Sequence, residues 1–108
     1  MKTVNIKTSN EKGIYIGRRN DALYHYGNPF SHLKSSIAAV RVKDREAAMQ
    51  AFEDWLDGIK YQEVEPERRS WILEHLHELE GQNLLCFCNP LPCHGDIYIH
   101  RLMKTKKL

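Results

Sequence analysis

The sequence has no long hydrophobic segment. None of its 108 residues lies in an apolar run that approaches the ~18 to 20 residues a helix needs to cross a bilayer. Residues 1–5 include a lysine but no apolar stretch typical of a signal peptide. We therefore expect a cytoplasmic protein without a membrane partner. The chain also lacks internal repeats and low-complexity tracts, so a repeat architecture is not expected.

An excess of charge of one sign is also missing. The formal net charge is +2, from 16 basic and 14 acidic residues. Proteins that bind duplex nucleic acid usually carry a basic stripe, so charge supports a nucleic-acid partner only weakly. The basic excess lies at Arg18-Arg19 and near the end of the chain. We expect residues 103–108 to form a frayed, solvated helix end.

Cysteine is scarce and confined to one place. All three cysteines lie within residues 86–93. A disulfide scaffold is implausible, because one bridge would leave an odd thiol and most of the chain unconstrained. In a reducing compartment, clustered cysteines favour metal binding or catalysis.

What the chain does have is an ordinary globular composition, with 42% hydrophobic and 28% charged residues. Its length allows one core, so we predict a single domain over residues 1–108. Alternating polarity predicts a strand at 3–8, and residues 14–17 predict a second strand that could pair with it as a hairpin. Residues 18–36 show no period. A segment this long and irregular is usually functional or disordered, and its aromatic and imidazole side chains argue against disorder.

The remaining elements follow from caps and periodicity. Residues 37–42 predict a strand, with the start of a helix as the alternative. Asp44 and Gly58 delimit a helix over 45–57. Its predicted buried stripe is Ala48, Ala51, Phe52, Trp55 and Ile59. A second helix opens at Glu65-Pro66-Glu67, buries Ile72, Leu76 and Leu79, and ends at Gly81. Residues 83–88 predict a strand. Asp96 predicts the N-cap of a last helix over 97–104, packed through Ile97, Leu102 and either Tyr98 or Ile99.

This order predicts an α/β fold. We expect a small sheet of three to four strands covered by about three helices, with the functional loop at a strand-to-helix junction. In open α/β sheets, ligands bind at the carboxyl ends of the strands. The loops after Gly17 and after Cys88 both follow predicted strands, so we expect them to form one pocket.

The functional centre is predicted at residues 86–96, Cys-Phe-Cys-Asn-Pro-Leu-Pro-Cys-His-Gly-Asp. Cys86, Cys88, Cys93 and His94 make a complete tetrahedral ligand set for zinc. The spacing is less favourable than the ligand types. Zinc holds two sulfur atoms roughly 3.7 Å apart, whereas side chains two apart on an extended strand start about 6.6 Å apart. The strand would have to bend at Phe87 or the rotamers lean inward.

Two other interpretations of the same loop stay open. Cys93 precedes a predicted helix N-terminus, which favours a thiolate, so Cys93 could act as a nucleophile assisted by His94. The loop amides could equally hold a phosphate there. In the second interpretation, Cys86 and Cys88 are inert core residues, His94 caps a turn and Asp96 is a plain N-cap.

Three stretches carry a resemblance to a known family: Tyr15-Ile16-Gly17-Arg18, Gly27-Asn28-Pro29-Phe30, and the loop read as Cys-aromatic-Cys-x-Pro-x-x-Cys-His-Gly-Asp. Over residues 13–104 the chain resembles a family of small domains, found in bacteria and their viruses, that is classed as a domain of unknown function. The family typically has tryptophan where this chain has Phe87, and often where it has Tyr26.

The resemblance implies one constellation of Arg18, Asn28, Cys88, Cys93, His94 and Asp96. Arg18 offers a cation for phosphate or carboxylate, Asn28 offers an amide, and Tyr26 stands beside them as a third candidate for ligand binding. Each has a plain alternative, since Arg18 could be a surface residue and Asn28 could only shape a turn. Phe30 and Trp55 are expected in the core. Surface positions are expected for His25, His32, His75, His77 and His100.

Together these patterns favour a small metal-binding α/β protein. It would bind zinc through the cysteine loop and a nucleotide or nucleic-acid-related ligand beside the Arg18–Phe30 loop. One alternative is a metal-free enzyme that uses Cys93 or Asp96 on a nucleotide or another phosphorylated substrate. Another is a non-enzymatic interaction module, such as a viral inhibitor of a host factor. Cys93, His94 and Asp96 are the candidate catalytic residues, and the sequence specifies neither a reaction nor an oligomeric state.

Overall fold

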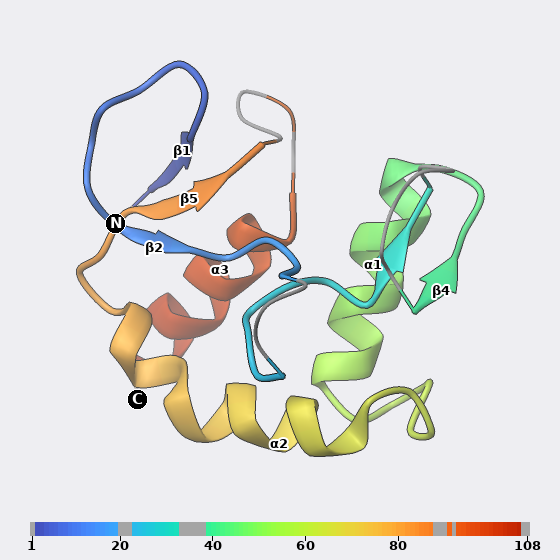
Figure 1. Cartoon of the computed structure of the whole chain (residues 1–108). Coiled ribbons are helices and arrows are strands. Elements are labelled where there is room, and N and C mark those ends of the chain that lie inside the picture. The colour runs from blue at the N-terminus through green and yellow to red at the C-terminus, as the bar shows by residue number, and fades with distance from the viewer. Residues whose placement is uncertain (1, 20–22, 33–38, 88–90, 92, 107–108) are drawn as a thin grey trace.

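A computed structural model describes residues 2–19, 23–32, 39–87, 91 and 93–106 of the chain. Three helices and two small sheets make up the α/β fold that the sequence predicts (Figure 1). In chain order the elements are β1 (Thr3–Asn5), β2 (Ile14–Tyr15), β3 (Phe30–Ser31), β4 (Val40–Arg41), α1 (Arg45–Leu56), α2 (Pro66–His75), the 3-10 helix η1 (Leu76–Leu79), β5 (Leu84–Cys86) and α3 (His94–Lys106). None of the helices in the described ranges is long and apolar enough to span a membrane.

The larger sheet has β5 at its centre, in the order β1-β5-β2, and both outer strands run parallel to β5. A central strand of a parallel sheet is covered on both sides, which the uninterrupted apolar run Leu84–Cys86 allows. The predicted hairpin of β1 and β2 is therefore wrong. The two strands flank β5 and run in the same direction, joined by residues 6–13 (Figure 1).

β1 is also shorter than predicted. The strand ends at Asn5, where the backbone turns: the Asn5 carbonyl accepts from the N–H groups of Thr8 and Ser9, and the Asn5 side chain accepts from Lys7 N–H at 2.8 Å. This local hydrogen bonding competes with strand pairing. Ile6 N–H still donates to the Cys86 carbonyl at 2.9 Å, and the chain leaves the sheet after it despite the alternating polarity of residues 6–8.

The smaller sheet pairs β3 with β4 in parallel, Phe30 opposite Val40 and Ser31 opposite Arg41. β3 lies inside the segment 18–36 that was predicted to be irregular, and its two residues are too few to show a period. Of the predicted strand 37–42, residues 40–41 form β4, while residues 37 and 38 lie outside the described ranges.

Helix α1 begins as predicted, with the Asp44 carboxylate accepting from Ala47 N–H at 2.8 Å. Its buried stripe differs from the predicted one in a single residue near the C-terminal end. Leu56 is buried and Ile59 is 64% exposed, because the helix stops at Leu56 and Gly58, at φ +77°, redirects the chain before Ile59. The guanidinium of Arg69 on α2 donates to the last carbonyls of α1, those of Trp55 and Leu56.

The segment predicted as the second helix is divided into α2 and the single 3-10 turn η1. Pro66 stands in the first turn, and Ile72, Leu76 and Leu79 are buried as predicted. Gly81, at φ +79°, follows this segment, where the predicted stop was placed.

Helix α3 begins at His94, so Asp96 lies inside its first turn and is not the N-cap. The helix continues to Lys106. Residues 103–106, predicted to be part of a frayed tail, are therefore helical. Tyr98 is fully buried and takes the packing position for which Ile99 was the alternative.

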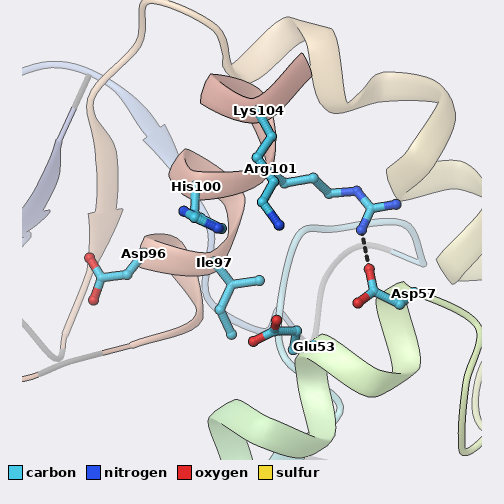
Figure 2. A pocket seen from close by; sticks show the side chains of 7 residues that line it. All are labelled: Glu53, Asp57, Asp96, Ile97, His100, Arg101 and Lys104. Atoms are coloured by element: carbon cyan, nitrogen blue, oxygen red, sulfur yellow. Dashed lines mark hydrogen bonds and ion pairs between the residues drawn. The ribbon is translucent and has the colours of Figure 1, made fainter. Parts of the chain in front are cut away.

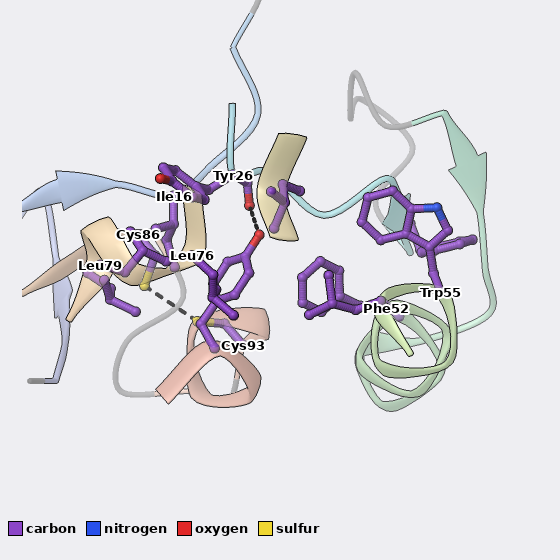
Figure 3. Close-up of a cluster of buried hydrophobic side chains, with 14 of the residues drawn as sticks. Ile16, Tyr26, Phe52, Trp55, Leu76, Leu79, Cys86 and Cys93 are labelled. Atoms are coloured by element: carbon purple, nitrogen blue, oxygen red, sulfur yellow. Dashed lines mark hydrogen bonds between the residues drawn. The ribbon is translucent and has the colours of Figure 1, made fainter. Parts of the chain in front are cut away.

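One hydrophobic core joins the larger sheet to all three helices (Figure 3). It includes Ile16 from the end of β2, Phe52 and Trp55 from α1, and Tyr98 from α3. The start of α3 packs closely on the sheet. A Cβ added at Gly95 would lie 2.7 Å from Ile16 Cδ1 and 2.8 Å from Thr3 Cγ2.

The segment after β2 and the turn before β3 approach each other at a second glycine. A Cβ added at Gly27 would lie 2.6 Å from the Cα and 2.7 Å from the nitrogen of Arg18. Both are backbone atoms, so neither can move aside as a side chain would. The absence of a side chain at position 27 is therefore what lets the two segments touch.

We expect Gly27→Ala to lower the free energy of unfolding by about 1–3 kcal/mol, as overpacking of a rigid contact does. Gly17→Ala is the matched control. There the added Cβ meets the outer end of the Tyr15 side chain, which can move, so the loss should be clearly smaller. Urea unfolding followed by tryptophan fluorescence measures both. Equal losses would contradict the importance of this backbone contact.

Candidate functional site

A cavity of about 310 Å³ lies where β2 and β5 end. All three sequence motifs contribute to it, so the predicted convergence of the two loops is found in the fold. Its lining residues are Tyr15, Gly17, Arg18, Asn28, Phe30, Ser31, His32, Arg45, Ala48, Met49, Cys86, Phe87, Leu91, Cys93 and His94.

The lining combines cations with aromatic rings. Arg18 and Arg45 contribute guanidinium groups, and no aspartate or glutamate is among the described residues that line the cavity. Tyr15 and Phe87 meet edge to face, with ring centroids 5.8 Å apart, and Phe87 is 54% exposed. The site therefore offers positive charge and accessible aromatic surface together.

Arg18 is held in place from outside the cavity. Its guanidinium donates to both carboxylate oxygens of Glu65, at 3.0 and 3.5 Å, and Arg68 donates to the same carboxylate at 2.9 Å. Burial alone would raise the pKa of Glu65, but the hydrogen bonds from Arg68 and Arg18 outweigh it and hold that pKa below its usual range. Glu65 stays ionised and fixes the Arg18 side chain.

Asn28 uses its amide to shape the turn, which was its plain alternative. Its Oδ1 accepts from Phe30 N–H at 2.9 Å, and its Nδ2 donates to the carbonyl of Ala48 on α1 at 3.2 Å. Asn28 thus ties the Gly-Asn-Pro-Phe turn to α1 while it lines the cavity.

Tyr26, predicted to bind a ligand, does not line the cavity. Its side chain is 7% exposed and its hydroxyl is within hydrogen-bonding distance of the His75 carbonyl and the Glu78 carboxylate, at 3.0 and 3.3 Å. Its ring packs on Trp71 and Tyr98. The Tyr26 ring therefore belongs to the hydrophobic core.

The N-terminal end of α3 is capped by Cys93 and Asp96. Cys93 precedes the helix, and its N–H donates to the Asp96 carboxylate at 3.1 Å. In return, Gly95 N–H donates to the Cys93 sulfur at 3.4 Å. This resembles a capping box, with cysteine at the N-cap and aspartate at the third helical position, except that the N-cap side chain accepts from the second helical residue. Asp96 therefore helps to begin the helix, although from a different position than predicted.

Asp96 also lies apart from the cavity. With Glu53, Asp57, Ile97, His100, Arg101 and Lys104 it lines a separate pocket of about 190 Å³ between α1 and α3 (Figure 2). Asp57 and Arg101 form an ion pair there. Asp96 is thus hydrogen-bonded to Cys93, with which it was grouped as a catalytic candidate, but it lines a different pocket from Cys93 and His94.

The sulfur atoms of Cys86 and Cys93 lie 3.6 Å apart, and both cysteines are free thiols (Figure 3). Cys86 ends β5 and Cys93 precedes α3, so the strand-to-helix loop brings them together. Cys88, the third predicted thiol ligand, lies outside the described residues. Within the described part of the chain, no three histidine, cysteine or acidic side chains are arranged to hold a metal ion.

His94 is turned toward backbone carbonyls. Its Nε2 lies 2.7 Å from the carbonyl oxygen of Ile16 and 3.1 Å from that of Tyr26. Carbonyl oxygens only accept, so Nε2 carries the proton and the lone pair of the neutral ring is on Nδ1. Burial lowers the pKa of His94 to about 4, and the ring is neutral at pH 7.

Comparison with known proteins agrees with the motifs. Residues 2–104 match the model of the family described as "Domain of unknown function (DUF4326)". The chain belongs to this family.

A relative in Enterobacteria phage T4, the "Uncharacterized 12.4 kDa protein in nrdA-td intergenic region", is 42% identical over 57 residues. The match covers 52% of this chain and 46% of the phage protein, so it spans about half of each. No solved structure gives a significant match. Membership of DUF4326 confirms the resemblance inferred from the three motifs.

In this DUF4326 member, the surface position predicted for His25 is wrong. His25 is 6% exposed, and its Nδ1 accepts from Gly27 N–H at 3.1 Å. Burial, followed by the charges of Arg68 and Arg18, lowers its pKa to about 4. The signal for this role is the spacing of two residues from Gly27, which suits a side chain that closes a turn. Of the other four histidines, His77 and His100 are exposed as predicted, and His32 and His75 are half-buried.

Sequence reasoning also missed two residues around the cavity. The sequence predicts Arg45 only as the start of a helix, whereas in the structure it also lines the cavity. Glu65 was read as a helix opener, and it also orients Arg18. Neither role has a local signal, because each depends on a contact between segments far apart in the sequence.

The buried, neutral state of His94 makes the stability of the fold depend on pH. Its pKa is about 4 when folded and 6.5 in the unfolded chain, so the unfolded state binds more protons between these values. The free energy of unfolding should rise with pH through this window and level off above pH 6.5. The shift corresponds to roughly 3 kcal/mol from His94, and His25 adds a contribution of the same sign.

Urea unfolding between pH 4.5 and 7.5 measures this dependence. His94→Gln should flatten the pH profile, because the glutamine amide can still donate to the two carbonyls but does not titrate in this range. His77→Gln, at an exposed position, is the matched control and should keep the wild-type profile. A wild-type profile in His94→Gln would contradict the assignment.

Proposed function

We propose that this chain binds a phosphorylated small molecule of the nucleotide type in the cavity at the ends of β2 and β5. One observation carries the proposal. Segments from four parts of the sequence gather two arginines and several aromatic rings around one cavity whose described lining contains no carboxylate. Such a site favours a ligand with an anionic group and a flat ring.

The anionic part of the ligand would bind Arg18 and Arg45. A guanidinium presents a rigid set of donors that matches phosphate oxygens. Arg18 is oriented before binding by its two contacts with Glu65, so little side-chain entropy remains to be lost. The N-terminus of α3 is a weaker candidate for phosphate, because Cys93 and Asp96 already cap it.

The ring of the ligand would lie against Tyr15 and Phe87. Aromatic side chains accept a base by stacking, whichever base it is. Phe87 is a large apolar side chain left 54% exposed beside the cavity, which suits a contact completed by a ligand. The volume of about 310 Å³ is at the small end of ligand pockets, so a mononucleotide or sugar phosphate fits better than a dinucleotide.

A metal-free enzyme that uses Cys93 is the alternative with support of its own. Cys93 is among the residues that line the cavity, and its sulfur accepts Gly95 N–H at the start of α3, where the helix dipole favours negative charge. The corresponding role for Asp96 lacks such support, because its carboxylate caps the helix and lines the other pocket.

Binding is measured by the thermal shift of the protein with a panel of mononucleotides, followed by calorimetric titration of any that stabilise it. We expect Arg45→Met to weaken binding roughly tenfold or more, because a hydrogen-bonded charge contributes about 1.5–3 kcal/mol. Arg41→Met is the control: Arg41 is exposed and is not among the residues that line the cavity. A panel without any stabilising nucleotide would contradict the proposal and favour the interaction module.

Zinc through the cysteine loop stays a prediction. One distance fits it, since the 3.6 Å between the sulfurs of Cys86 and Cys93 matches the separation of roughly 3.7 Å across a zinc ion. His94 fits less well, because its Nε2 donates to carbonyls and only Nδ1 has a lone pair for a metal. Bound there, zinc would hold the thiolates together and offer its charge to an anionic ligand.

Elemental analysis of protein purified without added metal tests this prediction. Zinc binding requires about one equivalent per chain in the wild type and its loss in Cys86→Ser. Cys86 is buried, so the circular dichroism of the variant must first match that of the wild type. Less than about a tenth of an equivalent in the wild type would contradict a zinc site.

A further inference from the structure

The two buried thiols also have the geometry of a pair that can be oxidised. Cys86 and Cys93 are 2% and 3% exposed, and their sulfur atoms face each other at 3.6 Å without a bond between them. A disulfide bond is about 2.05 Å long, so an approach of roughly 1.5 Å would form it.

The two sulfurs are not equivalent. The Cys93 sulfur sits at the start of α3 and accepts the N–H of Gly95 at 3.4 Å, so a backbone donor already points at this sulfur. Cys86 ends a buried strand and belongs to the hydrophobic core. This difference assigns Cys93 as the attacking thiol and Cys86 as the thiol that resolves a mixed disulfide.

A small oxidant can reach the pair through the cavity. Both cysteines line the cavity beside Phe87 and Leu91, each of which is more than half exposed. Both residues therefore belong to the wall of the cavity while they are nearly shielded from solvent, so a molecule that enters the cavity comes next to the pair.

We propose that Cys86 and Cys93 form a redox-active dithiol that exchanges with small disulfides. The Cys93 thiolate attacks one sulfur of the disulfide RSSR, breaks its S–S bond and releases RS⁻. The Cys86 thiol, on losing its proton, then attacks the Cys93 sulfur of the mixed disulfide and releases the second RS⁻. The Cys86–Cys93 bond has formed, the two protein protons end on two RSH molecules, and two electrons have passed from the protein to the disulfide.

This exchange does not depend on the proposed nucleotide. It concerns the thiols without a metal, since zinc bound to them would protect them from oxidation. The bond formed would join β5 to the start of α3 at the wall of the cavity. Reduction would restore the separate thiols, so the step is reversible.

The test is equilibration of the protein with glutathione buffers of increasing oxidised fraction, with a chelator present, followed by acid quenching, alkylation of free thiols and intact mass. Cys88→Ser is the background that removes the third thiol. In it, both remaining thiols should disappear together and return on reduction, with peptide mapping that joins residue 86 to residue 93.

Two further variants separate the roles of the thiols. In the Cys88→Ser background, Cys86→Ser should accumulate a stable glutathione adduct on Cys93, and Cys93→Ser should react at least tenfold more slowly at Cys86. Circular dichroism confirms that each variant is folded. A background variant that keeps both thiols in the most oxidising buffer, or that forms adducts without the Cys86–Cys93 bond, would overturn the proposal.

Discussion

The arrangement around the cavity depends on one buried imidazole. His94 donates from Nε2 to the carbonyls of Ile16 and Tyr26, so a single N–H joins the first turn of α3 to the end of β2 and to the turn before β3. The Tyr98 hydroxyl donates to the same Tyr26 carbonyl at 2.7 Å. A buried carbonyl without a donor costs about 1–3 kcal/mol, so these bonds fix where the two loops can lie. The remaining contacts of the site refine positions that this ring has already set.

Those contacts form a second, charged layer around the same loops. Arg68 donates to the carbonyl of His25 at 2.8 Å and to the carboxylate of Glu65. The same carboxylate also accepts from Arg18, which lines the cavity. The ion pairs are half-buried or buried, so solvent screens them less than it screens surface pairs. A cation that lines the cavity is thereby connected to α2, and the cavity keeps its positive charge without a carboxylate in its own wall.

The parts of the fold that follow local rules could be predicted from the sequence. Asp44 and Pro66 mark the starts of α1 and α2, and the convergence of loops follows from strand ends meeting at one edge of a sheet. The hairpin could not be excluded, because the true partner of β1 and β2 is β5, which is 81 residues beyond β1 and 70 beyond β2 (Thr3 and Ile14 both pair with Leu84). The roles of Tyr26 and His94 were also beyond the sequence. Residue type does not tell which way a ring points, and a ligand-type histidine and one that donates to a carbonyl look alike.

The four residues of the Cys-His-Gly-Asp motif differ in whether the fold accounts for them. Asp96 caps the helix, Gly95 allows α3 to touch the sheet, and His94 holds two loops, so three of its four residues have structural uses. Cys93 differs, because serine, threonine and aspartate are the usual N-caps and sulfur is a weak acceptor. Capping also gives no reason for a second thiol 3.6 Å away at the end of β5. The sulfur pair, more than the histidine or the aspartate, is therefore the part of the motif that requires a chemical explanation.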